Sequence, residues 1–493
     1  MCYNHNEQSL LYNYSAFLIE SLYLEWDNTK GAKRLNPFQT QFEAVQNYFK
    51  THATRPIKAR KKALKQLAEQ IKSNEQALMD ALKKDLGKNE VESYATEIGY
   101  TLKSIHHTRK SMAKWAKKQA VDTPIILFPA KSFIVKEPLG TILIIAPFNY
   151  PVQLVFEPLI GAIAAGNTAI VKPSELTPNV AAVVETIIQN AFDPNYVSVA
   201  QGGAETIQSL LQLPFDHIFF TGSEKVGQIV YEAAARQLIP VTLELGGKSP
   251  TIIDHTANLK VASERICFGK FINAGQTCVA PDYILIDKSV KDDFIKVLKS
   301  TIREFYGPFP IQSEDLGCIV NTRHFERLNH LLEAQQSNII YGGETSVEER
   351  KIAPTILDHV QTDDPIMKDE IFGPILPILT YEDLDEAIAI VQSKPKPLSL
   401  YLFSEDENVT NRILNELSFG SGAINDTLLQ LANPKLPFGG VGASGIGRYH
   451  GQYSFDTFSH LKPYIFKTTK LETGLLFPPY KGKLGYVRKL MKK

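Results

Sequence analysis

The sequence predicts an α/β protein in which a doubly wound parallel sheet is followed by a second α/β domain. Its 493 residues are too many for one ordinary hydrophobic core, because domains rarely exceed about 250 residues. Residues 141–146 (TILIIA) are apolar on both faces, which is typical of a buried parallel strand. Strand-like and helix-like segments then alternate, and this order predicts right-handed crossovers in an open sheet.

The elements of the first domain follow in order along the chain. Residues 55–88 carry leucine and isoleucine at helical spacing, with Gly87 where the last helix should end. Residues 132–137 form a strand-like segment ahead of the apolar strand. Further strands are expected at 168–172, 196–200 and 215–221, and helices at 179–191, 204–211 and 223–237. Such a sheet is the usual host for a nucleotide, which binds at the carboxyl ends of the strands.

After Glu244, strand-like and helix-like segments alternate again. Strands are expected at 251–254 and 283–287, and helices at 290–305, 325–335 and 382–392. No short-period repeat is visible, which argues against a solenoid. A second α/β domain is therefore the simplest interpretation.

Composition excludes several classes of partner. Hydrophobic residues make up 44% and charged residues 22% of the chain, as in soluble globular proteins. Lys plus Arg equal Asp plus Glu at 53 each, so no global field favours nucleic acid or an anionic membrane. Four irregularly spaced cysteines indicate neither a disulfide framework nor a paired zinc site. We expect no nucleic-acid partner, no metal and a cytoplasmic location.

The two ends of the chain carry less information. Residues 1–37 show no clean period and lack a basic leader or cleavage site, so we treat them as an extension of unknown structure. Residues 480–493 carry six positive charges and no acid. They allow peripheral membrane contact, but charges without an apolar anchor bind weakly, and a solvated tail is favoured.

Cys278 is the candidate nucleophile. It stands in the stretch NAGQTCVAPDY, between Gly275 and Pro281, where a turn can place backbone amides around its sulfur. A thiol acts as thiolate, and amides, a helix start or a cation must usually lower its pKa for this. Most cysteines are buried packing residues, so the assignment depends on the rest of the chain.

Two further strings suggest a nucleotide. Gly222, Ser223 and Gly227 lie at a strand-to-helix turn, where free amides and the helix dipole can hold a pyrophosphate. This string lacks the first glycine of G-x-G-x-x-G, and a turn without ligand explains it equally well. Lys172 and Glu175 follow a buried strand and suit a ribose diol, and Glu175 would repel a 2′-phosphate, which favours NAD over NADP. A solvated ion pair is the alternative.

Three polar side chains stand beside proline or glycine. Asn149 lies between two prolines, and a fixed amide suits an oxyanion donor. Glu244 precedes a glycine pair and Glu370 lies near a tight turn. Two acids and a thiol can divide the work of base and ligand holder. Each residue alone would more often be a turn or surface group.

Taken together, these strings resemble the aldehyde dehydrogenase superfamily. FNYP, KPSE, FTGS with GSEKVG, ELGGKSP, NAGQTCVAPDY, EIFGP and PFGGVGASGIGRYHG occur in the family's order. The resemblance covers the chain from about Pro37 to its C-terminus. The last motif, with the downstream SFDTFSH, is most similar to the class 3 or fatty aldehyde dehydrogenase branch.

The resemblance implies a mechanism. Cys278 attacks the aldehyde, the Asn149 amide and the Cys278 N–H hold the oxyanion, and Glu244 is the general base that deprotonates the hydrolytic water. A second set of residues would hold NAD: Glu370 and Phe372 at the nicotinamide ribose and ring, Lys172 and Glu175 at the adenine ribose, and Gly222, Ser223 and Gly227 near the pyrophosphate. NADP stays possible. The branch favours medium- or long-chain aliphatic or aromatic aldehydes.

The resemblance also implies a domain plan. A Rossmann-type cofactor domain would span residues 38–244, interrupted by an oligomerisation hairpin at about 121–139. A catalytic domain would span 245–436, and residues 437–493 would return to the cofactor domain and add a strand near 457–464 that joins subunits. A homodimer is expected.

Three rival functions remain at this stage. A relative that transfers the acyl group to coenzyme A needs no deacylating base, so Glu244 argues against it. A cofactor-independent thiol hydrolase would not need Lys172, Glu175 or Glu370. A catalytically silent relative should have lost the cysteine.

Overall fold

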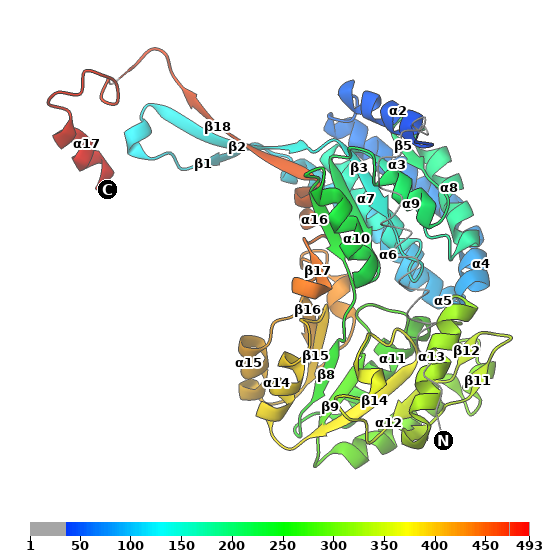
Figure 1. The fold of residues 1–493 in the computed structure, drawn as a ribbon. Coiled ribbons are helices and arrows are strands. Elements are labelled where there is room, and N and C mark those ends of the chain that lie inside the picture. The colour runs from blue at the N-terminus through cyan, green and yellow to red at the C-terminus, as the bar shows by residue number, and fades with distance from the viewer. Residues whose placement is uncertain (1–35, 473, 493) are drawn as a thin grey trace, which may run out of the picture.

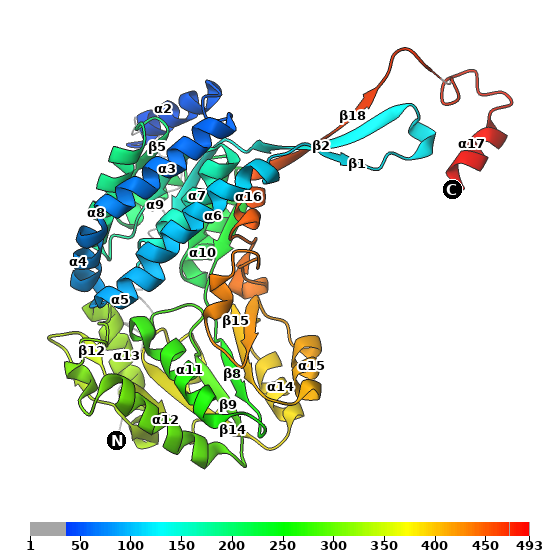
Figure 2. The same cartoon turned by 180° about the vertical axis from the view of Figure 1, so that it is seen from behind.

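The computed structural model describes residues 36–472 and 474–492. It shows two α/β units, one above the other, and a long arm that projects from the upper unit (Figures 1 and 2). The predicted fold class is confirmed, because each unit is built on a mostly parallel sheet with helices on both faces. Most of the N-terminal extension predicted at 1–37 lies outside the described residues.

The upper unit contains a six-stranded sheet with the order β17-β7-β6-β3-β4-β5. Its strands are β3 (Thr141–Ile145), β4 (Thr168–Lys172), β5 (Val197–Val199), β6 (His217–Thr221), β7 (Val241–Glu244) and β17 (Gly445–Ile446). All are parallel except β17. The chain runs outward from β3 to β4 and β5 and then returns to β6 on the other side of β3. The switch point of this doubly wound sheet therefore lies between β3 and β6.

Strand β3 is apolar on both faces because a hydrophobic core lies on each side of the sheet. Ile142 and Ile144 belong to the core on one side of the sheet. Leu143 and Ile145 belong to the core on the other side. The flanking helices are α2 (Gln39–Lys50), α3 (Ile57–Ser73), α4 (Glu75–Leu86), α6 (Gly99–Trp115), α7 (Gln153–Ala165), α8 (Pro178–Ala191), α9 (Ala204–Leu210) and α10 (Glu224–Ala235).

The lower unit contains a seven-stranded sheet with the order β10-β13-β14-β9-β8-β15-β16. Its strands are β8 (Pro250–Ile253), β9 (Tyr283–Asp287), β10 (Ile339–Tyr341), β13 (Thr355–Leu357), β14 (Ile375–Tyr381), β15 (Ser399–Phe403) and β16 (Ser421–Ile424). Its helices are α11 (Leu259–Phe271), α12 (Lys291–Tyr306), α13 (Thr322–Ala334), α14 (Leu384–Gln392) and α15 (Glu407–Glu416). Only β10 runs antiparallel to its neighbour.

The arm is a three-stranded antiparallel sheet made of β1 (Gln119–Val121), β2 (Ala130–Pro138) and β18 (Ser459–Lys467). The C-terminal strand pairs with the hairpin along its whole length, from Ser459 opposite Pro138 to Lys467 opposite Ala130. Helix α16 (Gln452–Thr457) precedes this strand, and α17 (Leu484–Met491) lies at the tip of the arm (Figure 1). None of the helices in the described ranges is long and apolar enough to cross a bilayer.

One short region departs from regular helix. Helix α5 (Glu90–Ser93) runs into a π-helical turn, η1 (Tyr94–Ile98), which leads directly into α6. π-Helical turns are uncommon and frequently mark functional sites. This turn lies beside the loop that follows β3, as the contacts described below show.

Candidate active site

Two sheet edges face each other across the junction of the units. Asn149 follows β3, Gly222 follows β6, and Glu244 is the last residue of β7, all at carboxyl ends. Cys278 precedes β9 and Glu370 precedes β14, so both lie at amino ends of the lower sheet. The site therefore joins the carboxyl edge of one sheet to the amino edge of the other.

The loop before Cys278 is held in an unusual backbone conformation. Asn273 and Ala274 have φ of 53° and 51°, and Gly275 has φ of 74°. A Cβ on Gly275 would lie 2.4 Å from the carbonyl oxygen of Gly373, so only glycine allows the loop to approach the segment of Glu370 this closely. The Gln276 side chain donates to the carbonyls of Asn273 and Cys318 and accepts from Val320 N–H. These contacts place Cys278 at a defined position, part-buried between buried neighbours.

Asn149 is hydrogen-bonded to this loop. Its Nδ2 donates to the Gln276 carbonyl at 3.0 Å, and its own carbonyl accepts from Asn273 Nδ2 at 2.8 Å. The hydroxyl of the next residue, Tyr150, lies 2.7 Å from Thr277 Oγ1. Asn149 and Tyr150 are thus bonded to Gln276 and Thr277, the two residues before Cys278.

Glu244 differs from Asn149 because its carboxyl group is buried without a partner. Only 2% of the residue is exposed, and neither carboxyl oxygen has a hydrogen-bond partner among the described residues. Burial alone raises the pKa of Glu244 well above its usual value. A buried, unpartnered carboxyl group can take a proton from a bound water or thiol.

Glu370 comes close to the same strand end. A Cβ on Gly246 would lie 2.0 Å from Glu370 Oε2, so Gly246 makes room for this carboxyl group. Burial, followed by the nearby Asp282 carboxylate, raises the pKa of Glu370 to about 8. Its Oε1 has no hydrogen-bond partner within the described part of the chain. Phe372, two residues on, has φ of 50° and packs edge-on against Phe148 with ring centres 5.8 Å apart.

The electrostatics of Cys278 correct one expectation. Backbone N–H groups of Cys278 and Val279 do face the sulfur and lower its pKa, as the sequence predicts. Burial outweighs them, and the Glu370 and Glu244 carboxylates add to it, so the pKa of the thiol is raised rather than lowered. The local sequence shows the amides but not the two acids that the fold brings near. Cys278 therefore needs a proton acceptor to become a thiolate.

Five of the residues predicted to hold a nucleotide lie at or after the carboxyl ends of β4 and β6 in the upper sheet. Lys172, at the end of β4, is buried and forms an ion pair with the more exposed Glu175. Ser223 is the N-cap of α10 and accepts from Val226 N–H at 3.4 Å. Gly227 is buried, and a Cβ there would lie 2.6 Å from a Leu245 methyl carbon. The geometry thus gives Gly227 a packing role between helix and strand, whereas Gly222 and Ser223 lie at the free helix start.

Sequence reasoning missed two buried charges at this site. Lys88 and Glu97 form an ion pair with Nζ and Oε1 2.7 Å apart, and both side chains are 0% exposed. Lys88 Nζ also donates to the Asn149 carbonyl at 3.0 Å. A lysine one position after a helix-ending glycine looks like an ordinary surface residue, so the sequence contained no signal for it.

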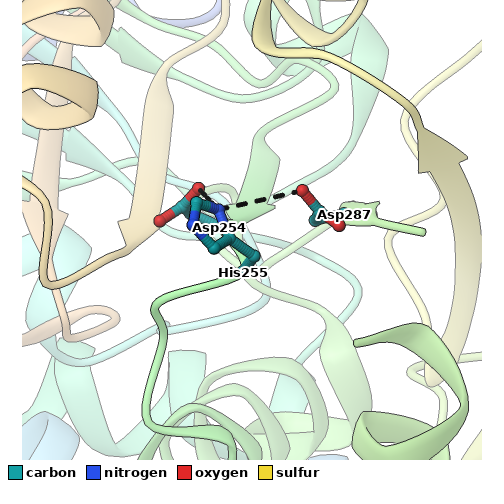
Figure 3. Close-up of side chains that lie close together, drawn as sticks. All are labelled: Asp254, His255 and Asp287. Carbon is teal, nitrogen blue, oxygen red and sulfur yellow. Dashed lines mark hydrogen bonds and ion pairs between the residues drawn. The ribbon is translucent and has the colours of Figure 1, made fainter. Parts of the chain in front are cut away.

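A second cluster of polar groups lies at the opposite edge of the lower sheet. Asp254 and His255 follow β8, and Asp287 ends β9; Figure 3 shows the imidazole between the two carboxylates. His255 Nδ1 lies 3.0 Å from Asp254 and 4.0 Å from Asp287. Asp254 also accepts from the hydroxyls of Thr256 and Ser404. Protein donors thus already use the Asp254 carboxylate, and the cluster is far from Cys278 along β9.

The chain is similar to known proteins over most of its length. The model of the aldehyde dehydrogenase family matches residues 35–463. A 4,4'-diaponeurosporen-aldehyde dehydrogenase of Staphylococcus aureus is 64% identical over 93% of this chain and 100% of its own length. Aldehyde dehydrogenase family 3 member F1 of Arabidopsis thaliana is 44% identical over 89% of this chain and 92% of its own.

Solved structures show the same fold. The substrate-bound state of Staphylococcus aureus AldH superposes with a TM-score of 0.92 at 64% identity and covers 93% of this chain and 100% of that one. Two more distant relatives were solved with nucleotides: an indole-3-acetaldehyde dehydrogenase of P. syringae with NAD+ and a glyceraldehyde-3-phosphate dehydrogenase of Methanocaldococcus jannaschii with NADP. Their TM-scores are 0.80 and 0.78, at 25% and 26% identity over 87% of this chain and 88% and 94% of theirs.

Proposed function

The chain belongs to the aldehyde dehydrogenase family, and on this premise we propose that it oxidises medium- or long-chain aliphatic or aromatic aldehydes to carboxylic acids with NAD. One observation carries the proposal. Cys278 and Asn149 lie in loops of different units and Glu244 ends β7, yet the Asn149 amide is bonded to the loop of Cys278 and the Glu244 carboxylate acts on the pKa of the thiol.

The first half of the reaction uses Cys278 and Asn149. The sulfur loses its proton to bulk water and bonds to the carbonyl carbon of the aldehyde. The Asn149 amide and the Cys278 N–H then hold the oxygen as it becomes negative. Loss of hydride from the carbon leaves a thioester on Cys278.

The second half uses Glu244 as general base. Both of its oxygens are buried and unpartnered among the described residues, so one can accept a proton from a water molecule. The hydroxide formed attacks the thioester carbon, the carbon–sulfur bond breaks, and the carboxylic acid leaves. Because the pKa of Glu244 is raised, this step should accelerate as the pH rises.

The residues present fit a nicotinamide dinucleotide, which supplies the acceptor for the hydride. Glu370 has an unpartnered oxygen that can accept from a ribose hydroxyl. In the first turn of α10 the Val226 N–H is bonded to Ser223, and the N–H groups of Glu224 and Lys225, which have no partner inside the helix, can hold a pyrophosphate. Glu175 is 43% exposed at the side chain and can accept from a second ribose, and its charge disfavours a 2′-phosphate.

The surroundings of the cysteine support an apolar substrate. Cys278 packs against the large apolar core of the upper unit, which contains Phe438 and Tyr449, and the part-buried Leu428 and Leu431 pack against the same core. Apolar surroundings suit a hydrocarbon chain or ring better than a short polar aldehyde. The Staphylococcus aureus relative is named for 4,4'-diaponeurosporen-aldehyde, and we include that compound among the substrates to test.

The test is NAD(P)H absorbance with the purified chain. Hexanal, benzaldehyde and acetaldehyde are compared with NAD and with NADP, and Glu175→Gln is the matched variant. We expect a rise with NAD, a preference for hexanal or benzaldehyde over acetaldehyde, and a larger NADP share in the variant. A preference for acetaldehyde would contradict the apolar site. Absence of any rise, with acyl-coenzyme A formation or ester cleavage instead, would assign one of the rival reactions.

The arm supports a homodimer. Strand β18 lies at the edge of its sheet and exposes Leu461, Ile465 and Phe466. An apolar edge strand on a projecting arm is a surface that a second copy can cover. Light scattering at micromolar concentration should give twice the chain mass, and Ile465→Asp should shift the protein toward monomer. A monomeric wild-type chain would contradict the proposal.

A further inference from the structure

We propose that the buried Lys88–Glu97 ion pair is a positioning device for the oxyanion site. It would hold the main chain of Asn149 and the start of α7 so that the Asn149 amide keeps its place beside Cys278. The inference rests on the proposed function, because it concerns the same oxyanion site. The contacts of Lys88 and Glu97 reach the Asn149 segment and not the Cys278 sulfur. Their effect on the reaction rate would therefore pass through Asn149.

The pair is too costly to be explained as an ordinary stabilising contact. Both side chains are completely buried. Removing two charges from water is unfavourable, and their attraction offsets this only when further hydrogen bonds complete the arrangement. The partners of those further hydrogen bonds therefore indicate which segment of the chain the ion pair holds in place.

Every hydrogen bond that the two side chains make to other described residues goes to the segment 149–153. Lys88 Nζ donates to the Asn149 carbonyl at 3.0 Å. Glu97 Oε2 accepts from Val152 N–H and Gln153 N–H, each at 2.9 Å. Lys88 Nζ also lies 4.0 Å from the centre of the Tyr150 ring, a cation–π contact.

Glu97 acts as the cap of α7. Val152 is the N-cap residue and Gln153 the first residue of this helix, so their N–H groups have no partner inside it. The side chain of the N-cap residue, Val152, forms no capping hydrogen bond. A carboxylate at this position satisfies two donors and complements the positive end of the helix dipole. The start of α7 is thereby fixed relative to η1, which carries Glu97.

Lys88 acts on the other side of the same segment. The Asn149 carbonyl receives Lys88 Nζ and Asn273 Nδ2, while Asn149 Nδ2 donates one hydrogen to the Gln276 carbonyl. A side-chain amide has two N–H donors, so one remains for the substrate oxygen. Because the main chain and one donor are held, the direction of the second donor is set before substrate binds. Such preorganisation is what makes an oxyanion donor effective.

Another ion pair serves as a matched control. Lys291 and Asp358 lie 3.0 Å apart, with side chains 16% and 12% exposed. Lys291 begins α12 and Asp358 follows β13, at the edge of the lower sheet opposite to Cys278. Loss of this pair should affect stability but not the chemistry.

The test is a double-mutant cycle on the pre-steady-state rate of NADH formation. Glu97→Gln should slow this step about 10- to 100-fold, the loss expected from a displacement of the order of 1 Å, and leave KM for NAD unchanged. In an Asn149→Ala background the same change should cost nothing further, because the effect passes through that amide. Asp358→Asn should keep the wild-type rate.

The outcomes separate this inference from the proposed function. If Asn149→Ala leaves the rate unchanged, the oxyanion role itself fails. If Asn149→Ala slows the reaction but Glu97→Gln has no effect, or an additive one, only the positioning role is overturned. Should Glu97→Gln not fold, the double variant Lys88→Met/Glu97→Gln leaves no buried charge unpaired, and a wild-type rate in that folded variant would equally overturn the proposal.

Discussion

The two sheets contribute to the site from opposite ends of their strands. In the six-stranded sheet, Asn149 and Glu244 stand at carboxyl ends, as expected for a doubly wound fold. In the seven-stranded sheet, Cys278 and Glu370 stand at amino ends, and the carboxyl ends of β8 and β9 carry the remote Asp254–His255–Asp287 cluster instead. The rule that ligands bind at carboxyl ends therefore locates only half of this site.

The difference between the edges extends to their chemistry. The amino edge of the lower sheet presents the thiol and a carboxyl group whose pKa is about 8. The carboxyl edge of the upper sheet presents one amide held by hydrogen bonds and one acid with none among the described residues. Residues of both edges are therefore expected to act in one reaction, and four variants test what each residue contributes.

The largest effect is expected at the amino edge. Cys278→Ala removes the atom that bonds to the aldehyde, so turnover should fall on the order of 10⁴-fold or more. The part-buried side chain changes little in volume, and the thermal midpoint should stay close to that of the wild type. NADH formation and a melting curve on the same sample measure both. Substantial residual oxidation would remove Cys278 from its role.

The next effect is expected at the carboxyl edge. Glu244→Gln removes the base. Deacylation should therefore slow by about 10²- to 10⁴-fold, which is the usual contribution of a general base in enzymes. The first turnover should still release NADH if only deacylation depends on Glu244, and intact mass should reveal the acyl-enzyme. The wild-type deacylation rate should rise with pH, because burial raises the pKa of Glu244, and the variant should lose this rise. An unchanged steady-state rate and pH profile would contradict the assignment.

A somewhat smaller effect is expected from Asn149. Asn149→Ala should reduce the rate of the first NADH release on the order of 10²- to 10³-fold, as for other oxyanion donors. Stopped-flow absorbance measures this step separately from deacylation. A loss confined to deacylation would instead assign Asn149 to the same step as Glu244.

The smallest effect is expected from Glu370→Gln on the reactivity of the free thiol. The Glu370 carboxylate raises the pKa of Cys278, and this carboxyl group is itself charged only above about pH 8. The variant should therefore react a few-fold faster with iodoacetamide at about pH 9 and at the wild-type rate at about pH 6.5. Equal rates at both pH values would show that the carboxyl group does not act on the sulfur.

Local sequence was sufficient for several parts of this molecule. The apolar run 141–146 predicts a strand buried on both faces, and β3 (Thr141–Ile145) is that strand. Gly87 predicts the end of a helix, and it is the left-handed C-cap of α4. These features depend on side chains a few residues apart, so a short window contains their physical cause. In the lower sheet only β8 and β9 were predicted. The edge strands β10 and β16 are short and part-exposed, but the buried strands β13, β14 and β15 were not predicted either.

Other parts were decided by tertiary contacts. The sequence itself determined the α/β class and, through motifs that occur in the family's order, the choice of Cys278, Asn149 and Glu244 as candidates. Only the folded structure showed that Lys88 and Glu97 are completely buried beside Asn149, and that burial, with two nearby acids, raises the pKa of Cys278. Burial and the effect of distant charges depend on which segments meet in space. No single segment of the sequence predicts that the two sheet edges approach each other.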